Sequence, residues 1–170
     1  DTSGEELVLV ESGAIIEYLM QNYGKNSSLI IPKTGSQQER DYRYWLHFSE
    51  GSLMSPLLLR LIFNRIKTTP VPFFVKPITK AIANKVLSEF VNPNIDRLLD
   101  FIDASLKGKQ WFLGDQLSGA DIQMSYPLEA SVTSGLIDDQ YPGIQSYVER
   151  IHRQPSYQDA LLKGGKYEYA

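Results

Sequence analysis

Apolar residues recur at helical spacing over most of the chain, which predicts a mainly helical fold. The repeat is strongest over 37–66, where Leu46, Leu53, Leu57 and Leu61 recur near helical spacing. Proline lacks a backbone donor and crowds the preceding turn, so we expect a kink between Gly51 and Pro56 and a bend at Pro93. The predicted helices span 13–23, 37–66, 78–107, 122–131, 142–154 and 155–162.

The opening of the chain has a different pattern. Leu7-Val8-Leu9-Val10 is a short apolar run between charged residues, and such a run predicts a buried strand. Ser12 is the expected N-cap of the helix that follows. A lone strand needs partners, so we interpret residues 1–31 as the end of a larger thioredoxin-like α/β domain. After the polar linker, residues 36–170 form the predicted all-helical domain.

A doubly capped helix is the sharpest local signal. With Ser118 as N-cap, Asp121 falls at the third helical position, and its carboxylate can accept from the amide of the cap. Leu117 and Ile122 occupy the positions of a hydrophobic staple. Such a cap contributes about 1 kcal/mol. The helix behind it is apolar on almost all sides, so we expect it to be buried.

Composition excludes several kinds of chemistry for these residues. The 170 residues carry 17 Lys and Arg against 20 Asp and Glu, a net charge of −3, which disfavours nucleic acid as a partner. There is no cysteine, so a thiol nucleophile and a Cys-ligated metal are excluded here. The two histidines, His47 and His152, lie far apart in sequence, and we expect no metal site. We expect His152, in a polar stretch, to lie at the surface.

Glu11 and Ser12 are the first candidate site. A helix N-terminus offers free amides and a partial positive charge to a carboxylate, and Ser12 adds a hydroxyl donor. Glu11 can accept an ammonium. Together they match the head of an α-amino acid. Residue types alone favour the simpler alternative, in which Ser12 caps the helix and Glu11 complements its dipole.

Two further stretches have a functional and a structural interpretation. His47 and Glu50 lie three apart on one helix face and can form an acid–base pair, although hydrogen bonding at a helix interface is the commoner role. Residues 51–88 contain six Lys or Arg and no Asp or Glu, with Phe73-Phe74 in their middle. That run fits an anionic membrane surface, but a solvated loop with a partly buried aromatic pair is favoured.

Three segments resemble glutathione transferases. The run 10–19, VESGAIIEYL, is similar to the fourth strand and third helix of their glutathione-binding half. The run 111–122, WFLGDQLSGADI, is similar to the capped core helix of their helical half. The run 44–54, YWLHFSEGSLM, is typical of the bacterial and fungal yeast-type-I subset, as are 124–129 and 140–144.

The resemblance implies a cytoplasmic homodimer that conjugates the thiolate of glutathione to hydrophobic electrophiles in detoxification, with some peroxide reduction and no metal. Glu11 and Ser12 would hold the γ-glutamyl amine and carboxylate. Residues on the first helix of the bundle would line the electrophile site between the domains. These candidates are Tyr44, His47, Phe48, Gly51 and Met54.

The resemblance also defines what to expect beyond this chain. The strands that open the family fold, the group that activates the thiol and the cis-proline loop are not in these residues, so we expect a longer parent protein and no catalytic residue here. Association with the endoplasmic reticulum membrane is a further implication. The alternative function is a non-catalytic interaction module on the same fold, of the scaffold or translation-factor type.

Overall fold

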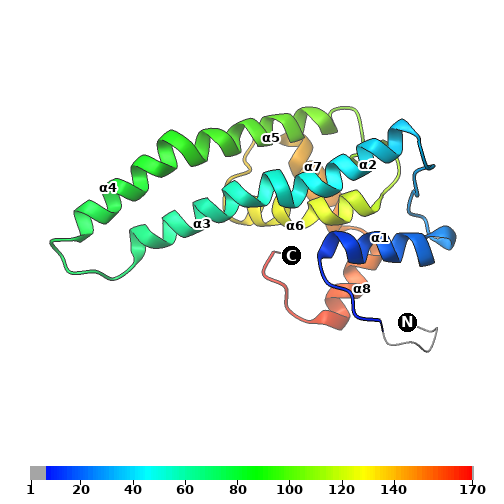
Figure 1. Cartoon of the computed structure of the whole chain (residues 1–170), viewed down its shortest axis with the longest axis horizontal. Helices are drawn as coiled ribbons and strands as arrows, with labels where there is room; N and C mark the ends of the chain where they lie inside the picture. The colour runs from blue at the N-terminus through cyan, green and yellow to red at the C-terminus, as the bar shows by residue number, and fades with distance from the viewer. Residues whose placement is uncertain (1–6, 170) are drawn as a thin grey trace.

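The computed structural model describes residues 7–169, and helices dominate this range (Figure 1). The predicted mainly α class is confirmed. The α-helices are α1 (Ser12–Tyr23), α2 (Gln37–Phe48), α3 (Ser55–Thr68), α4 (Lys76–Val86), α5 (Asn92–Leu106), α6 (Gly119–Thr133), α7 (Pro142–His152) and α8 (Pro155–Gly164). One short 3₁₀ turn, η1 (Gly24–Asn26), and two π-helical turns, η2 (Ser49–Met54) and η3 (Leu87–Val91), complete the helical elements.

The strand predicted at 7–10 is wrong. These residues have no regular structure, and Val8 and Val10 are 78% and 71% exposed. A strand needs a neighbour for its backbone donors and acceptors, and the described residues supply only isolated bridges elsewhere. Residues 7–10 therefore have the composition of a buried strand, but no described strand lies beside them to pair with.

Both predicted helix distortions occur, and each takes the form of a π turn. The ring of a proline crowds the carbonyl four residues earlier, and its nitrogen cannot donate to that carbonyl. For Pro56 this carbonyl belongs to Ser52, within η2; for Pro93 it belongs to Glu89, within η3. The wider turn therefore accommodates each proline as the long helix continues.

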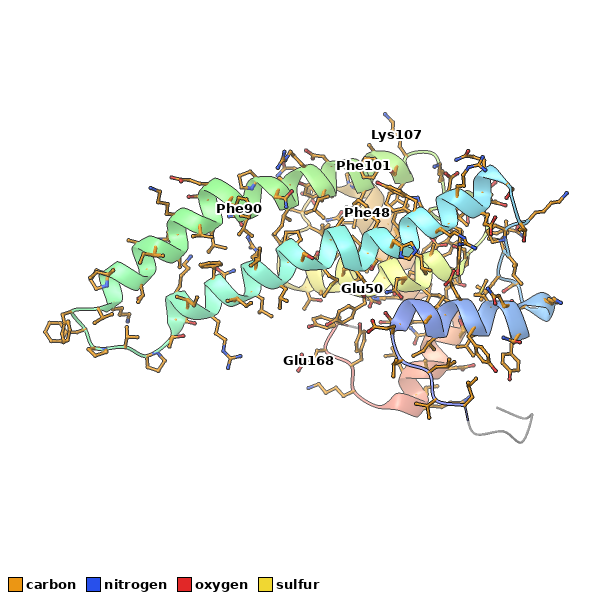
Figure 2. The ribbon with its side chains drawn as sticks, viewed as in Figure 1. Phe48, Glu50, Phe90, Phe101, Lys107 and Glu168 are labelled. Carbon is orange, nitrogen blue, oxygen red and sulfur yellow. The ribbon has the colours of Figure 1, made fainter. Side chains whose placement is uncertain are left out.

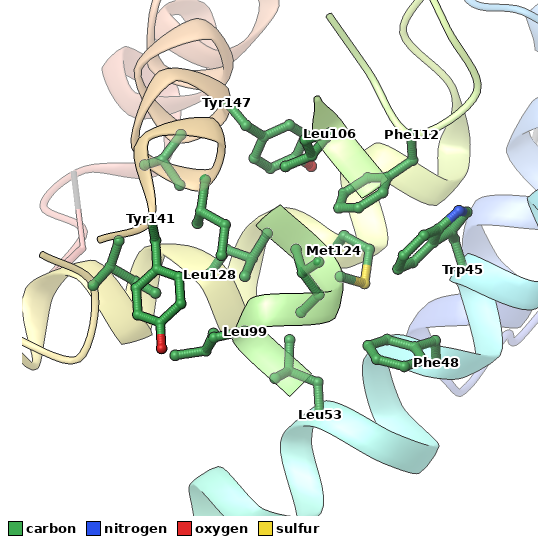
Figure 3. Close-up of a cluster of buried hydrophobic side chains, with 14 of the residues drawn as sticks. Trp45, Phe48, Leu53, Leu99, Leu106, Phe112, Met124, Leu128, Tyr141 and Tyr147 are labelled. Carbon is green, nitrogen blue, oxygen red and sulfur yellow. The ribbon is translucent and has the colours of Figure 1, made fainter. Parts of the chain in front are cut away.

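The core lies around α6, where α2, α5 and α7 meet (Figure 3). Met124 and Leu128 of α6 are fully buried, as the apolar pattern of that helix predicts. Aromatic rings close one end of the core: Trp45 and Phe112 have centroids 4.4 Å apart, and Phe112 packs against Tyr147 at 5.1 Å. A continuous apolar core of this kind is the main source of stability in such a bundle.

The predicted capping box starts α6. The Asp121 carboxylate accepts from the Ser118 amide at 2.8 Å and from the Ser118 hydroxyl at 2.6 Å, and its second oxygen accepts from the Phe112 amide at 2.8 Å. Asp121 therefore joins the start of α6 to the preceding loop. The staple is less complete than predicted, because Ile122 is 42% exposed.

Helix α1 packs directly on α6 through a glycine. A Cβ atom built on Gly119 would lie 2.6 Å from Ile16 Cγ2 and 2.7 Å from the Tyr42 hydroxyl. The segment after α1 continues this contact, because the Ile30 amide donates to the Leu117 carbonyl at 2.8 Å. Glycine thus allows the first helix to approach the first turn of the core helix closely.

Helices α3 and α4 pack against each other and extend beyond the rest of the bundle (Figure 1). The loop between them, residues 69–75, forms the far end of this hairpin. Phe73 and Phe74 in the loop are 87% and 66% exposed. The prediction of a partly buried aromatic pair is therefore wrong, since no described element covers the tip.

Candidate functional site

The N-terminus of α1 carries an unusual backbone conformation. Glu11 precedes the helix with φ 72° and ψ 121°, and among the described residues it alone combines a positive φ with a side chain. This conformation is unfavourable for a non-glycine residue and is typical of functional sites. No side chain caps the helix, so its first amides remain available to a ligand.

Ser12 does not cap α1, which corrects the sequence prediction. Ser12 is the first helical residue, and its hydroxyl accepts from Gln123 Nε2 at 2.8 Å. The same nitrogen donates to Glu50 Oε1 at 3.0 Å. One amide group of α6 therefore joins the start of α1 to the π turn η2 (Figure 2 labels Glu50).

Gln123 is held in place by a second set of contacts. Pro127 cannot donate to the Gln123 carbonyl, and the buried Ser49 hydroxyl donates to it instead at 2.9 Å. Gln123 itself is 4% exposed. A polar residue in an otherwise apolar, buried helix is the sequence signal for this role.

An open hollow of about 410 Å³ is lined by residues of α2 and η2. Tyr44, His47 and Phe48, three of the five predicted wall residues, line it together with Arg43 and Ser52. The other two predicted wall residues, Gly51 and Met54, do not line this hollow. Gly51 is exposed, and Met54 is half-buried outside the lining.

Phe101 of α5 was not predicted for this region. Its ring lies 5.7 Å from Phe48 and 6.3 Å from Tyr44, and it stacks on Trp45 at 5.6 Å (Figure 2). Phe101 is 43% exposed. Because it lies outside the buried stripe of α5, periodicity alone did not connect it to α2. The hollow thus has an apolar aromatic border, and burial raises the pKa of Tyr44.

The two histidines have separate environments. Among the described contacts, His47 forms no hydrogen bond with Glu50, whose carboxylate accepts from Gln123 instead. His152, expected at the surface, is partly buried and lies 3.0 Å from Glu129 through Nε2. Glu129 is 2% exposed and also accepts from the Tyr167 hydroxyl at 2.9 Å. This second cluster attaches the chain end to α6.

The described residues contain neither a cluster of metal ligands nor a membrane-spanning helix. Within residues 7–169, no three or more His, Asp or Glu side chains are grouped as metal ligands. In the same range, every helix is too short or too polar to cross a bilayer.

A family comparison extends these observations. The model of the glutathione S-transferase C-terminal domain matches residues 65–155, more than half of the chain. The chain belongs to the glutathione S-transferase family. Its helical unit, with the capping box of α6, is therefore the C-terminal unit of that family, as the resemblance implied.

Curated transferases from two yeasts are similar to the chain. Glutathione S-transferase 1 of Saccharomyces cerevisiae is 27% identical over 157 residues, 91% of this chain and 66% of that protein. Glutathione S-transferase 3 of Schizosaccharomyces pombe is 29% identical over 155 residues, 91% of this chain and 62% of that protein. The Escherichia coli disulfide-bond oxidoreductase YfcG is 27% identical over 161 residues, 94% and 66% of the two chains. The chain thus spans slightly less than two thirds of these relatives.

Solved transferase structures share the fold. A glutathione S-transferase from Actinobacillus pleuropneumoniae superposes with a TM-score of 0.67 at 28% identity, covering 95% of this chain and 66% of that one. A glutathione transferase homologue from Lodderomyces elongisporus, crystallised with two glutathione molecules per subunit, superposes with a TM-score of 0.71 at 17% identity, covering 95% and 70%. The second likeness concerns the fold alone.

Proposed function

We propose that Glu11, Ser12 and the free amides of α1 bind the γ-glutamyl end of glutathione. The observation that carries this proposal is the uncapped N-terminus of α1 behind the positive φ of Glu11. The amides and the Ser12 hydroxyl would hold the carboxylate, and the Glu11 carboxylate would hold the ammonium. Gln123 would orient the Ser12 hydroxyl, because its Nε2 occupies one lone pair of that oxygen.

The proposed reaction is conjugation of the glutathione thiolate to a hydrophobic electrophile. In this proposal the nucleophile is the sulfur of glutathione, and its thiolate is the reactive form. The aromatic border of Tyr44, Phe48 and Phe101 beside the hollow suits an apolar substrate. We assign the group that activates the thiol to none of these residues.

The test of the glutathione site is retention of the full-length protein on immobilised glutathione. We expect Glu11→Ala with Ser12→Ala to abolish retention, because both poles of the glutamyl group lose their partners. Glu17→Ala is the matched control: it removes a carboxylate from the same helix, but Glu17 lines a different hollow, between α1 and α2. Unchanged retention of the double variant, with correct folding by circular dichroism, would refute the assignment.

Activity assays distinguish conjugation from the alternative functions. Conjugation of a chromogenic electrophile such as chlorodinitrobenzene supports the transferase. The similarity to YfcG favours a second reaction, in which two glutathione thiols reduce a disulfide and leave as glutathione disulfide; reduction of hydroxyethyl disulfide tests it. A protein that binds glutathione and performs neither reaction, nor peroxide reduction, would instead be a non-catalytic interaction module.

The remaining parts of the proposal concern the whole protein. We propose that residues 1–31 end a glutathione-binding domain, that 36–170 form the helical domain, and that the protein acts in detoxification as a cytoplasmic homodimer, with endoplasmic reticulum association as a further possibility. Support comes from the direct packing of α1 on α6 and from the yeast relatives. Light scattering of the full-length protein tests the dimer.

A further inference from the structure

Residues 165–169, the tail segment, turn back from α8 and dock on α6 (Figure 1). The Tyr167 hydroxyl donates to Glu129 Oε2 of α6 at 2.9 Å. The ring of Tyr169 packs edge to face on Tyr126 of the same helix, with centroids 5.7 Å apart. One hydrogen bond to a carboxylate and one aromatic contact thus connect the tail segment to the core helix.

Glu129 needs its hydrogen-bond donors whether or not the tail segment is docked. Its side chain is 2% exposed, and its two oxygens contact separate partners: Oε1 lies 3.0 Å from His152 Nε2, and Oε2 accepts from Tyr167. A carboxylate that is shielded from water is costly to leave unpaired. If Tyr167 leaves, another group near Oε2 must therefore donate in its place.

Tyr157 of α8 is the candidate for this second donor. Its hydroxyl is buried and has no hydrogen-bond partner among the described residues. Its ring stacks on His152, with centroids 4.9 Å apart, and so lies beside the imidazole that contacts Glu129. Burial raises the pKa of both Tyr157 and Tyr167, and the neighbouring Glu129 carboxylate raises both further. The carboxylate therefore has two phenols within reach and accepts from one of them.

We propose that Tyr157 and Tyr167 are alternative donors to Glu129, and that this exchange lets the tail segment detach from α6 at low cost. In the docked arrangement Tyr167 holds Oε2. In the detached arrangement the Tyr157 hydroxyl turns to the same oxygen and gains the partner that it lacks when the tail segment is docked. The number of hydrogen bonds to Glu129 is then unchanged. Two arrangements of similar free energy are the basis of a conformational switch.

Detachment would uncover a defined face of α6. Tyr126, on which the tail segment packs, lies three positions after Gln123, and residues at this spacing share a helix face. Gln123 donates to Ser12 and to Glu50. The docked tail segment therefore packs on the face of α6 that carries this junction (Figure 2 labels Glu50 and, in the tail segment, Glu168). The exchange of donors itself does not depend on the proposed glutathione site.

The simpler alternative is a fixed cluster in which Tyr157 contributes only the packing of its ring. In that arrangement, removal of the Tyr157 hydroxyl would leave the docking of the tail segment unchanged or would loosen it. The exchange predicts the opposite sign. Because only the detached arrangement uses the Tyr157 hydroxyl, its removal should hold the tail segment more firmly on α6.

The test is the rate of tryptic cleavage of the full-length protein after the exposed Lys166, followed by mass spectrometry. This rate reports the detached population, because a protease cuts a segment that has opened. We expect Tyr157→Phe to slow the cleavage by about threefold to tenfold. Tyr167→Phe alone should change it by less than about threefold, because Tyr157 then donates to Glu129 in both arrangements. Tyr167→Phe added to Tyr157→Phe should restore the rate to within about threefold of the original, because both arrangements then lack a phenol donor.

Matched controls separate the exchange from general effects. Tyr141→Phe removes a phenol hydroxyl from another buried residue, whose charged neighbours are aspartates rather than Glu129. It should leave the cleavage after Lys166 unchanged. Cleavage after Lys107 and Lys109, in the exposed stretch that follows α5, is the internal reference within each sample and should be the same in every variant. Urea unfolding verifies that each variant is folded.

Two results would overturn the proposal. One is cleavage after Lys166 that is unchanged or faster in Tyr157→Phe, which would mean that water or no group at all replaces Tyr167 at Glu129. The other is an effect of Tyr167→Phe that is the same with and without the Tyr157 hydroxyl, since independent contacts give additive changes. Hydrogen exchange of the amides of residues 165–169 is a second measurement, and their protection should rise in Tyr157→Phe. Retention on glutathione is measured in parallel, so that failure of the glutathione site is recognised separately.

Discussion

Substitution of Gly119 by alanine tests how closely α1 packs on the core helix. The added Cβ would lie 2.6 Å from Ile16 Cγ2, 2.7 Å from the Tyr42 hydroxyl and 3.2 Å from Met20 Cγ. The first two distances are shorter than real Cβ contacts. Met20 can change rotamer, but Ile16 is β-branched and stiff, and Tyr42 is only 7% exposed. Helix α1 must therefore move outward.

The expected cost follows from this geometry. Overpacking a well-packed contact typically costs about 1–3 kcal/mol, and here two separate neighbours must shift. The gain in helix propensity on replacing glycine by alanine, about 1 kcal/mol at an interior position, is smaller at the first turn of α6. We therefore expect Gly119→Ala to reduce the free energy of unfolding by about 1–3 kcal/mol.

Urea unfolding followed by circular dichroism measures this change, and Gly51→Ala is its control. A Cβ at Gly51 would meet nothing within 4 Å, and its φ is not positive, so that variant should be neutral or slightly stabilised. Adding Tyr42→Phe to Gly119→Ala removes one of the two close contacts and should recover part of the loss. A Gly119→Ala protein as stable as the original would show that α1 does not pack on α6 as described.

Three further predictions concern buried polar groups. Ser49→Ala should cost about 1–3 kcal/mol in urea unfolding, because the Gln123 carbonyl loses its donor; an unchanged midpoint would refute that role. Tyr42→Phe alone should be neutral or stabilising by thermal unfolding, since the buried Tyr42 hydroxyl has no hydrogen-bond partner in the described structure. Desolvation raises the pKa of Tyr42 from 10.0 to about 12, and that of the buried Tyr147 further. Because the folded protein therefore holds these two phenol protons more tightly than the unfolded chain does, the free energy of unfolding should be unaffected by them below pH 10 and should fall as pH rises from 10 towards 12. A free energy of unfolding that does not change with pH above 10 would contradict this prediction.

Local patterns predicted much of the helical unit. The leucine repeat of 37–66, the disruptive prolines and the Ser118–Asp121 cap each act through near neighbours in sequence, and each has the expected structural result. Periodicity also identified α6 as buried, with Met124 and Leu128 at no exposure. These signals depend on backbone chemistry and amphipathicity, which are readable along the chain.

Contacts between distant elements were not readable in the same way. Gln123 meets Ser12 across 111 positions and Glu50 across 73, and no pattern in one segment specifies a partner so far away. Phe101 of α5 contacts Tyr44 of α2, and His152 of α7 contacts the buried Glu129 of α6. Both contacts depend on which helices pack together. The strand at 7–10 failed for the converse reason: its composition is correct, but pairing depends on residues elsewhere.

The two π turns determine how the hairpin is oriented. A turn that takes in one extra residue makes the helix resume about 100° out of phase with its earlier part. Since η2 and η3 interrupt both long helices just before Pro56 and Pro93, the faces of α3 and α4 are not extrapolations of the faces of α2 and α5. Deleting one residue from either turn would rotate α3 or α4 about its own axis relative to the other helix. The side chains that this helix exposes would then change, while the packing of α2 and α5 in the bundle would stay as it is.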